Sequence, residues 1–264
     1  MFPLSWPRRL ARASAVLALA GLLLTDGVAA ADASPSRSAV DGNYTFKANG
    51  WTGTLAVSDA ATGRPSIDMR FYDGVIEHLS GFWSTAGRTL TIGRPLSGGV
   101  SQTYTLYLGD HHPSSPVFGG FFTESDTDAT RYGAYAHWYQ PPAALAARPA
   151  LDPVPSNLLP GWDFNGNGWT GSLSWDPLGC GGNPAQLQFD GNVYWETVTD
   201  TWDPSTQTLT LVRSLSGGLS QTYTLYRAAA HVGGGLMLGG FFTQSDSPGM
   251  WFAAFAEAET SLGC

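Results

Sequence analysis

The chain is dominated by short stretches in which apolar and polar residues alternate. Alternation with a period of two places successive side chains on opposite faces of a β-strand. These stretches are rich in Thr, Val, Ile, Tyr, Phe and Trp, and are separated by Gly, Asp, Asn and Pro, a composition typical of strands joined by turns. In the first half the pattern predicts eight strands, at residues 43–48, 51–58, 66–72, 75–83, 88–94, 101–108, 117–123 and 132–138.

The second half of the chain repeats the first. Three segments recur in the same order with few changes, and they pair as 49–55 with 167–173, 96–107 with 215–226, and 119–123 with 239–243. The spacing between matching segments is close to 120 residues, far longer than the ~20–50 residues of solenoid and propeller repeats. Each copy is therefore a domain-sized unit, and the chain is the product of a duplication.

The repeat and the proline content divide the chain into five parts. Residues 1–31 are predicted to be an export signal, for the reasons given below, and residues 32–40 a disordered N-terminal segment. The two repeats occupy 41–139 and 160–264. Between them, 140–159 is rich in Pro and Ala; proline cannot join a strand ladder and stiffens the chain, so this segment is expected to be a semi-rigid linker.

The fold class follows from the strand order. Consecutive strands joined by short turns are antiparallel neighbours, and eight of them close into an up-and-down β-barrel without exposed edges. The prediction is an all-β protein with two such barrels in tandem; a two-sheet β-sandwich is the alternative. In strand number, length and order the chain resembles the calycin group of avidin-like and lipocalin-like barrels. The Gly-x-Trp motif that lipocalins have near the first strand is absent; the chain has Asn-Gly-Trp at 49–51 and 167–169 instead. The biotin-contact residues of avidins have no match either, so the resemblance implies the architecture and no function.

The N-terminus has the features of a secretion signal. Arg8, Arg9 and Arg12 precede the apolar run 13–24, and Ala occupies each position of 29–31, as in a signal peptidase site. The apolar run is shorter than the ~20 residues that span a bilayer. We therefore expect a secreted mature protein without a membrane span, exported by the general or the twin-arginine route.

The charge of the mature chain limits which partners it can bind, and its cysteines suggest a disulfide. Removal of residues 1–31 leaves ten basic and twenty acidic residues, a net charge of about −10 that repels nucleic acids and anionic membranes. Cys180 and Cys264 are the two cysteines. An exported protein is exposed to oxidising conditions, which favours a disulfide between them; two free thiols are the alternative.

Strand alternation also predicts which polar side chains point inward. Glu77 has the same parity as Leu79 and Trp83, and Arg94 the same parity as Ile92. An inward charge is costly unless it is paired, so Glu77 is expected to meet Arg94, and likewise in the second repeat. The predicted ligand-binding residues are Glu77, Trp83, Arg94, Gln102, Tyr104, Glu196, Trp202, Arg213, Gln221 and Tyr223.

No catalytic, metal-binding or nucleotide-binding signature occurs in the sequence, so no catalytic residue, metal or cofactor is predicted. The leading hypothesis is a non-catalytic binding protein for a small apolar or amphipathic ligand, or for a glycan. An alternative is an enzyme that uses Glu77 and Glu196 as acid–base groups with Arg94 and Arg213 as anion clamps. A raised glutamate pKa favours that enzyme, whereas a tight arginine pair lowers the pKa. A third possibility is a structural cell-envelope module with filled barrels.

Overall fold

The computed structural model describes residues 38–71, 74–111, 116–127, 130–138, 161–175, 184–192, 194–228 and 236–258. The predicted export signal, the predicted linker and both cysteines lie outside the described residues. No helix in the described part of the chain is long and apolar enough to cross a membrane.

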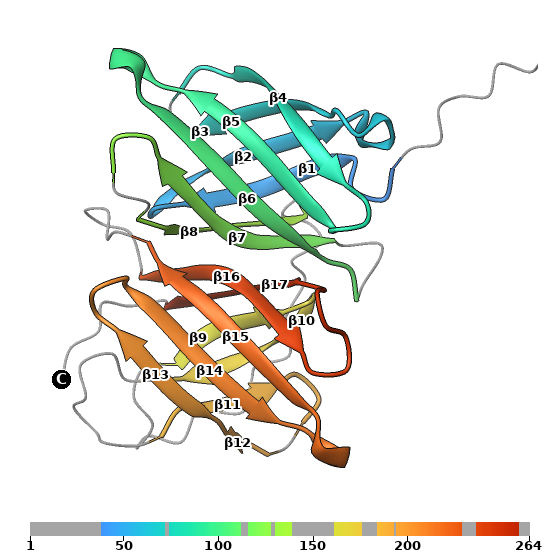
Figure 1. Ribbon diagram of the computed structural model, residues 1–264, viewed down its shortest axis with the longest axis vertical. Helices are drawn as coiled ribbons and strands as arrows, with labels where there is room; N and C mark the ends of the chain where they lie inside the picture. The colour runs from blue at the N-terminus through green and yellow to red at the C-terminus, as the bar shows by residue number, and fades with distance from the viewer. Residues whose placement is uncertain are drawn as a thin grey trace, which may run out of the picture. The chain divides into compact units, whose positions relative to one another are not determined.

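The first repeat is a closed antiparallel barrel in which every strand pairs with its neighbour in sequence and β8 returns to β1 (Figure 1). This confirms the predicted fold class. The strands lie within one or two residues of the predicted ranges. They are β1 (Gly42–Ala48), β2 (Trp51–Ser58), β3 (Ser66–Phe71), β4 (Glu77–Ser84), β5 (Thr89–Pro95), β6 (Ser101–Gly109), β7 (Val117–Glu124) and β8 (Tyr132–Trp138).

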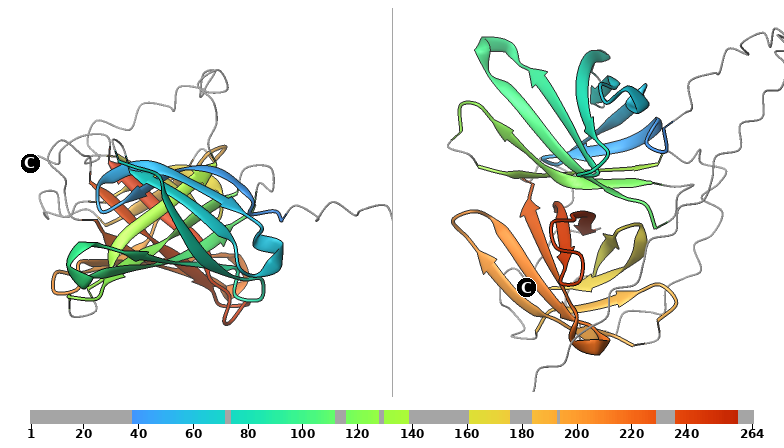
Figure 2. Two further views of the ribbon diagram at one scale, coloured as in Figure 1. Left: turned by 90° about the horizontal axis from the view of Figure 1, so that it is seen from above. Right: turned by 45° about the vertical axis from the view of Figure 1, so that its right-hand side comes forward.

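The second repeat forms a nine-stranded antiparallel sheet with the same order of strands. Its strands are β9 (Gly161–Gly166), β10 (Trp169–Ser174), β11 (Gln186–Phe189), β12 (Glu196–Thr197), β13 (Thr199–Asp203), β14 (Thr208–Ser214), β15 (Ser220–Arg227), β16 (Met237–Gln244) and β17 (Phe252–Ala258). The ninth strand arises because the counterpart of β4 is divided at Val198 into β12 and β13. These two strands end the sheet on opposite sides and are consecutive in the chain. The sheet of each repeat curls round on itself (Figure 2).

The Asn-Gly-Trp motif recurs in both repeats because of its backbone geometry. Asn49 and Gly50 connect β1 to β2 with positive φ angles of 51° and 80°, and Asn167 and Gly168 do the same between β9 and β10. Two consecutive positive φ values are typical of the tight hairpin turn whose twist matches the flanking strands, and Asn-Gly is the pair that adopts it most readily. The Asn-Gly-Trp sequence is therefore a turn signal.

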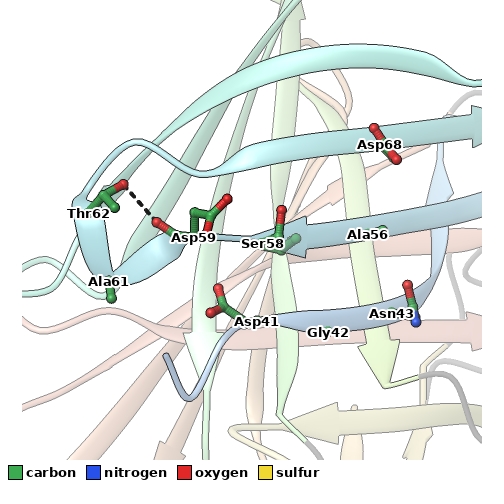
Figure 3. A pocket seen from close by; sticks show the side chains of 10 residues that line it. Asp41, Gly42, Asn43, Ala56, Ser58, Asp59, Ala61, Thr62 and Asp68 are labelled. Atoms are coloured by element: carbon green, nitrogen blue, oxygen red, sulfur yellow. Dashed lines mark hydrogen bonds between the residues drawn. The ribbon is translucent and has the colours of Figure 1, made fainter. Parts of the chain in front are cut away.

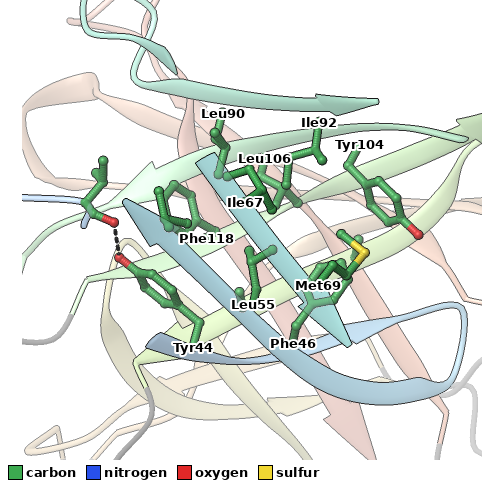
Figure 4. Packing of buried hydrophobic residues seen from close by; sticks show 14 of the residues in the cluster. Tyr44, Phe46, Leu55, Ile67, Met69, Leu90, Ile92, Tyr104, Leu106 and Phe118 are labelled. Atoms are coloured by element: carbon green, nitrogen blue, oxygen red, sulfur yellow. Dashed lines mark hydrogen bonds between the residues drawn. The ribbon is translucent and has the colours of Figure 1, made fainter. Parts of the chain in front are cut away.

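The barrel interior is filled by side chains. In the first repeat the inward positions carry aromatic and branched residues that are almost fully buried, among them Tyr44, Phe46, Leu55, Ile67, Leu90, Leu106 and Phe118 (Figure 4). An eight-stranded barrel is just wide enough for such side chains to occupy it. Tyr44 places its one polar atom by donating a hydrogen bond of 2.8 Å to the carbonyl oxygen of Val40. A second core of the same kind fills the other repeat.

The two repeats contact each other through equivalent surfaces within one compact unit, Pro35–Cys264. Gly119 of β7 lies against Ala254 of β17, and the equivalent Gly239 of β16 lies against Ala134 of β8. A Cβ atom at either glycine would approach a backbone nitrogen to 2.6 or 2.5 Å, so only glycine allows this approach. Because each contact has its reciprocal, the interface has the self-complementary form of a two-fold dimer.

Aromatic contacts repeat this reciprocity. Tyr107 contacts Phe241, with ring centroids 4.9 Å apart, and Phe121 contacts Tyr226, with centroids 5.0 Å apart. In the repeat alignment Tyr107 is equivalent to Tyr226 and Phe121 to Phe241. The outward faces of β6, β7, β15 and β16 therefore use the same residues on both sides of the interface.

Polar contacts at this interface break the symmetry. Lys47, the single lysine of the chain, forms an ion pair with Glu257, whose other oxygen accepts a 2.6 Å hydrogen bond from the hydroxyl of Tyr135. The residues at the equivalent positions of Lys47 and Glu257 are Asn165 and His137, which cannot form this carboxylate–ammonium pair. The polar contacts thus favour pairing of the first repeat with the second over pairing of either repeat with itself.

Candidate functional site

The antiparallel strand order gathers the predicted polar residues of the first repeat at one end of the barrel. Glu77 is the first residue of β4, Arg94 lies near the end of β5, and Gln102 is the second residue of β6. In antiparallel neighbours the start of one strand lies beside the end of the next. Arg94 is directly opposite Gln102, and Gln102 is directly opposite Glu124 at the end of β7. We call this end of the barrel the first mouth.

Arg94 is the centre of a hydrogen-bonded network at the first mouth. Its guanidinium donates from Nε to Glu77 Oε2 (2.8 Å) and from Nη2 to Glu77 Oε1 (2.5 Å), which confirms the predicted pair. Nη1 donates to Gln102 Oε1 (3.0 Å), which also accepts from the hydroxyl of Tyr104 (2.7 Å). The same guanidinium lies 4.8 Å from the ring centroid of Phe71. Glu77, Gln102 and Phe71 together therefore fix the orientation of the Arg94 guanidinium.

The second repeat reproduces this network at its own mouth. Arg213 donates to both carboxylate oxygens of Glu196 at 2.7 Å, and to Gln221 Oε1 at 3.1 Å. The hydroxyl of Tyr223 donates to the same amide oxygen at 2.8 Å. The arginine lies 4.7 Å from the ring centroid of Phe189. The structure thus brings together eight of the ten predicted residues, four at each mouth.

The electrostatics of the network stabilise the charged forms. The hydrogen bonds from Arg94 hold the pKa of Glu77 below its usual value, and Arg213 does the same for Glu196. The pairing in turn raises the pKa of Arg94. Burial raises the pKa of Tyr104, so its hydroxyl remains a neutral donor. Both glutamates are therefore ionised at neutral pH, which does not suit them to donate a proton in catalysis.

A cavity of about 340 Å³ opens beside the network of the first mouth. Its wall combines aromatic rings with hydrogen-bonding groups, and its lining residues are Ala48, Asn49, Trp51, Phe71, Arg94, Gln102, Tyr104, Phe122 and Glu124. Trp51, which follows the β1–β2 turn, is 46% exposed. The side chain of Arg94 is 18% exposed and that of Glu77 32%. The network is thus accessible from solvent.

Trp83 and Trp202 lie away from these networks. Trp83 is the seventh residue of β4, so a strand length separates it from Glu77; its ring contacts Phe118 in the core. Trp202 contacts Trp175, with ring centroids 5.4 Å apart. A role of these two residues in ligand binding stays a prediction, but it concerns the opposite end of each barrel.

Sequence reasoning missed six residues that line the cavity: Ala48, Asn49, Trp51, Phe71, Phe122 and Glu124. A signal for Glu124 was present, because it has the same parity as Phe122 and directly follows the predicted strand 117–123. Trp51 likewise has the same parity as Leu55, and Phe71 the same parity as Ile67 and Met69. Alternation alone, however, does not show that these three strand ends meet at one mouth.

A second cavity, of about 480 Å³, lies where β1, β2 and β3 meet the turn Ala60–Thr62 (Figure 3). Its acidic residues have local roles. Asp41 accepts hydrogen bonds from the backbone N–H groups of Ser38 (3.0 Å) and Ala60 (2.9 Å), and Asp68 pairs with His78. None of the described residues that line this cavity is aromatic or cationic. It lacks the mixed wall that characterises the first mouth.

The histidines that the structure describes are not gathered into a metal-binding cluster. His111 stacks on Trp169, with ring centroids 3.6 Å apart, while His112 and His231 lie outside the described residues. Over the described ranges, no group of three or more His, Cys, Asp or Glu side chains is arranged to hold a metal ion.

No protein-family model matches the chain, and no curated protein matches it. Among solved structures, it is similar to the crystal structure of a protein of unknown function from the DUF3598 family of Nostoc punctiforme. The sequence identity is 12% and the TM-score 0.28, and the match covers 84% of this chain and 97% of the other. The observed architecture is that of antiparallel up-and-down barrels, and the resemblance to the calycin group stays a prediction.

Proposed function

We propose that this protein is a secreted, non-catalytic binding protein that holds a small polyhydroxylated ligand, such as a mono- or disaccharide, at the barrel mouth. The observation that carries the proposal is the cavity of about 340 Å³ whose wall joins aromatic rings to an ordered polar network. Aromatic rings stack on the C–H faces of a sugar ring, and the polar groups offer both donors and acceptors to its hydroxyls.

The size of the cavity and the filled core favour this class of ligand. Small-molecule sites typically measure about 300–1,000 Å³, and the first mouth lies at the lower end of that range. An apolar ligand in the barrel interior would compete with core side chains such as Leu55, Ile67 and Leu90, which are already buried there. The hydrogen-bonding groups at the mouth favour a polar ligand instead.

The charge state of the glutamates argues against the alternative of acid–base catalysis. Glu77 and Glu196 are each held by two hydrogen bonds from an arginine, and their pKa values are lowered. An acid catalyst at neutral pH needs a raised pKa instead.

The filled cores favour a second candidate function, a structural cell-envelope module. In such a module the Glu–Arg pairs would only orient the strand ends.

Ligand titration of the full-length mature chain distinguishes the two candidates. We expect hexoses to shift the NMR signals of the side-chain amide of Gln102, and Trp51→Ala to weaken binding about tenfold through lost stacking, equivalent to ~1.4 kcal/mol. Phe82→Ala is the matched control, because Phe82 is 57% exposed on β4 and does not line the cavity. Absence of any saccharide-dependent shift would favour the structural module.

Secretion is tested separately. The export signal is expected to be removed after Ala31, so N-terminal sequencing of the protein from the culture medium or periplasm is expected to begin at Asp32. Retention of residues 1–31 in a cell-associated product would contradict the proposed location.

A further inference from the structure

The two mouths differ in charge at one position of the network. Gln102 is paired across the strands with Glu124, whereas its equivalent Gln221 is paired with Gln244. In the first repeat the amide Nε2 of Gln102 donates to Glu124 Oε1 at 2.7 Å, and in the second that of Gln221 donates to Gln244 Oε1 at 2.9 Å. The hydrogen bond from the glutamine amide is thus kept, while the charge changes. Gln244 also donates from its own amide to Asp246 Oδ1 at 2.8 Å, a bond that the carboxylate of Glu124 cannot make.

The charges of the first mouth sum to an excess negative charge. Glu77 and Arg94 neutralise each other through two hydrogen bonds. Glu124 accepts a hydrogen bond from the neutral amide of Gln102, so its negative charge is not cancelled by this partner. The carboxylate of Glu124 lines the cavity. In the second mouth, Glu196 and Arg213 cancel in the same way and Gln244 adds no charge.

The aromatic wall complements this excess charge. Trp51 lines the same cavity as Glu124 and is 46% exposed, whereas the rings of Tyr104 and Phe122 behind it are each 1% exposed. The face of an aromatic ring attracts a cation. A cationic group on a ligand would thus meet the carboxylate of Glu124 and the exposed ring of Trp51 together. Arg94, the cation of this mouth, is already neutralised by Glu77 and repels such a group little.

We infer that the first mouth selects a ligand that carries an ammonium group, an amino sugar being the class that fits, whereas the second mouth lacks this preference. The inference rests on the proposed saccharide-binding function and specifies the substrate class of that site. Because the mouth is open to solvent, the preference is moderate: about five- to tenfold at low ionic strength, declining as salt screens the interaction.

The test uses full-length mature protein and exchanges the two residues that differ. Glucosamine, galactosamine and mannosamine are titrated against their parent hexoses and their N-acetyl derivatives, which keep the nitrogen but lose the charge. The side-chain amide signals of Gln102 and Gln221 report the two mouths separately. Glu124→Gln gives the first mouth the residue of the second, and Gln244→Glu is the reciprocal variant.

We expect an amino sugar to bind the first mouth about fivefold or more tightly than its parent hexose and N-acetyl derivative. Glu124→Gln is expected to make the affinities for the amino sugar and for its parent hexose equal at the first mouth, and Gln244→Glu to create the preference at the second mouth. Equal affinity of charged and neutral sugars at the first mouth would overturn the inference and leave the proposed function standing. If no sugar shifts either amide, the proposed function fails and the inference fails with it.

Discussion

The rings of Tyr135 and Phe255 stack face to face, with centroids 4.1 Å apart and planes 1° from parallel. The two residues hold equivalent positions on β8 and β17, so each repeat presents the same position to the other. A contact between equivalent residues marks the pseudo-two-fold axis of the interface, around which the reciprocal glycine and aromatic contacts are arranged. Duplication has thus joined within one chain two surfaces of the kind that form a homodimer.

The glycines of this interface are expected to be intolerant of any side chain. Gly119→Ala places a Cβ against the backbone of Ala254, and overpacking of this kind costs about 1–3 kcal/mol of the free energy of unfolding. Chemical denaturation of the full-length mature protein measures the loss. Gly93→Ala is the control, since a Cβ at that strand position meets nothing within 4 Å; equal effects of the two substitutions would contradict the close contact.

Removal of one partner of the mouth ion pair tests how far the network is buried. Glu77→Gln is expected to reduce the free energy of unfolding by about 1 kcal/mol, because both side chains are partly exposed and water screens the unpaired arginine. Asp68→Asn, in an outward pair with His78 on the neighbouring strand, provides the comparison. A loss of about 3–5 kcal/mol would instead show that Arg94 is left uncompensated in a buried environment.

The same pairs predict an acid-dependent loss of stability. The pKa values of Glu77 and Glu196 are lower in the folded protein than their ordinary value. Their contribution is therefore complete above the unfolded pKa of about 4.3 and is lost as the pH falls through the lowered folded pKa. Asp203, whose pKa is lowered to about 2 by hydrogen bonds from Ser205 and Thr206, adds to the same trend.

Denaturation midpoints measured at pH 7 and at pH 3 test this dependence. In the double variant Arg94→Met/Arg213→Met the glutamates lose the cause of their lowered pKa, so the decline toward pH 3 is expected to be shallower than in the unmodified protein. An unchanged slope would mean that other carboxylates account for the acid sensitivity.

The cysteine pairing stays a prediction of the sequence. Non-reducing peptide mapping by mass spectrometry of exported protein is expected to find Cys180 bonded to Cys264. The bond would close a loop that contains most of the second repeat. Because it restricts the unfolded chain, it would stabilise the fold by at most about 4–5 kcal/mol. Free thiols at both positions would contradict the prediction.

Local sequence determined the strands and their order. The alternation of apolar and polar residues located all eight strands of the first repeat, because a strand exposes side chains to opposite faces with a period of two. The same period placed Glu77 and Arg94 on the inner face of neighbouring strands, and the observed hydrogen bonds confirm that pairing. Short turns made neighbours in sequence neighbours in space, so this part of the mouth needed no tertiary information.

The tertiary structure decided which surfaces and cavities result. The glycines at 119 and 239 matched in sequence, but nothing local showed that each lies against the other repeat, because an outward-facing glycine looks the same at an interface and in solvent. The filled interior and the mouth cavity depend on how the strands tilt as the sheet closes, and this sets which side chains from non-adjacent strands meet. Closure of the sheet brought Trp51 of β2 and Glu124 of β7 to the same mouth, and no period along a single strand records this. The separation of Trp83 from Glu77, in contrast, follows from their spacing along β4.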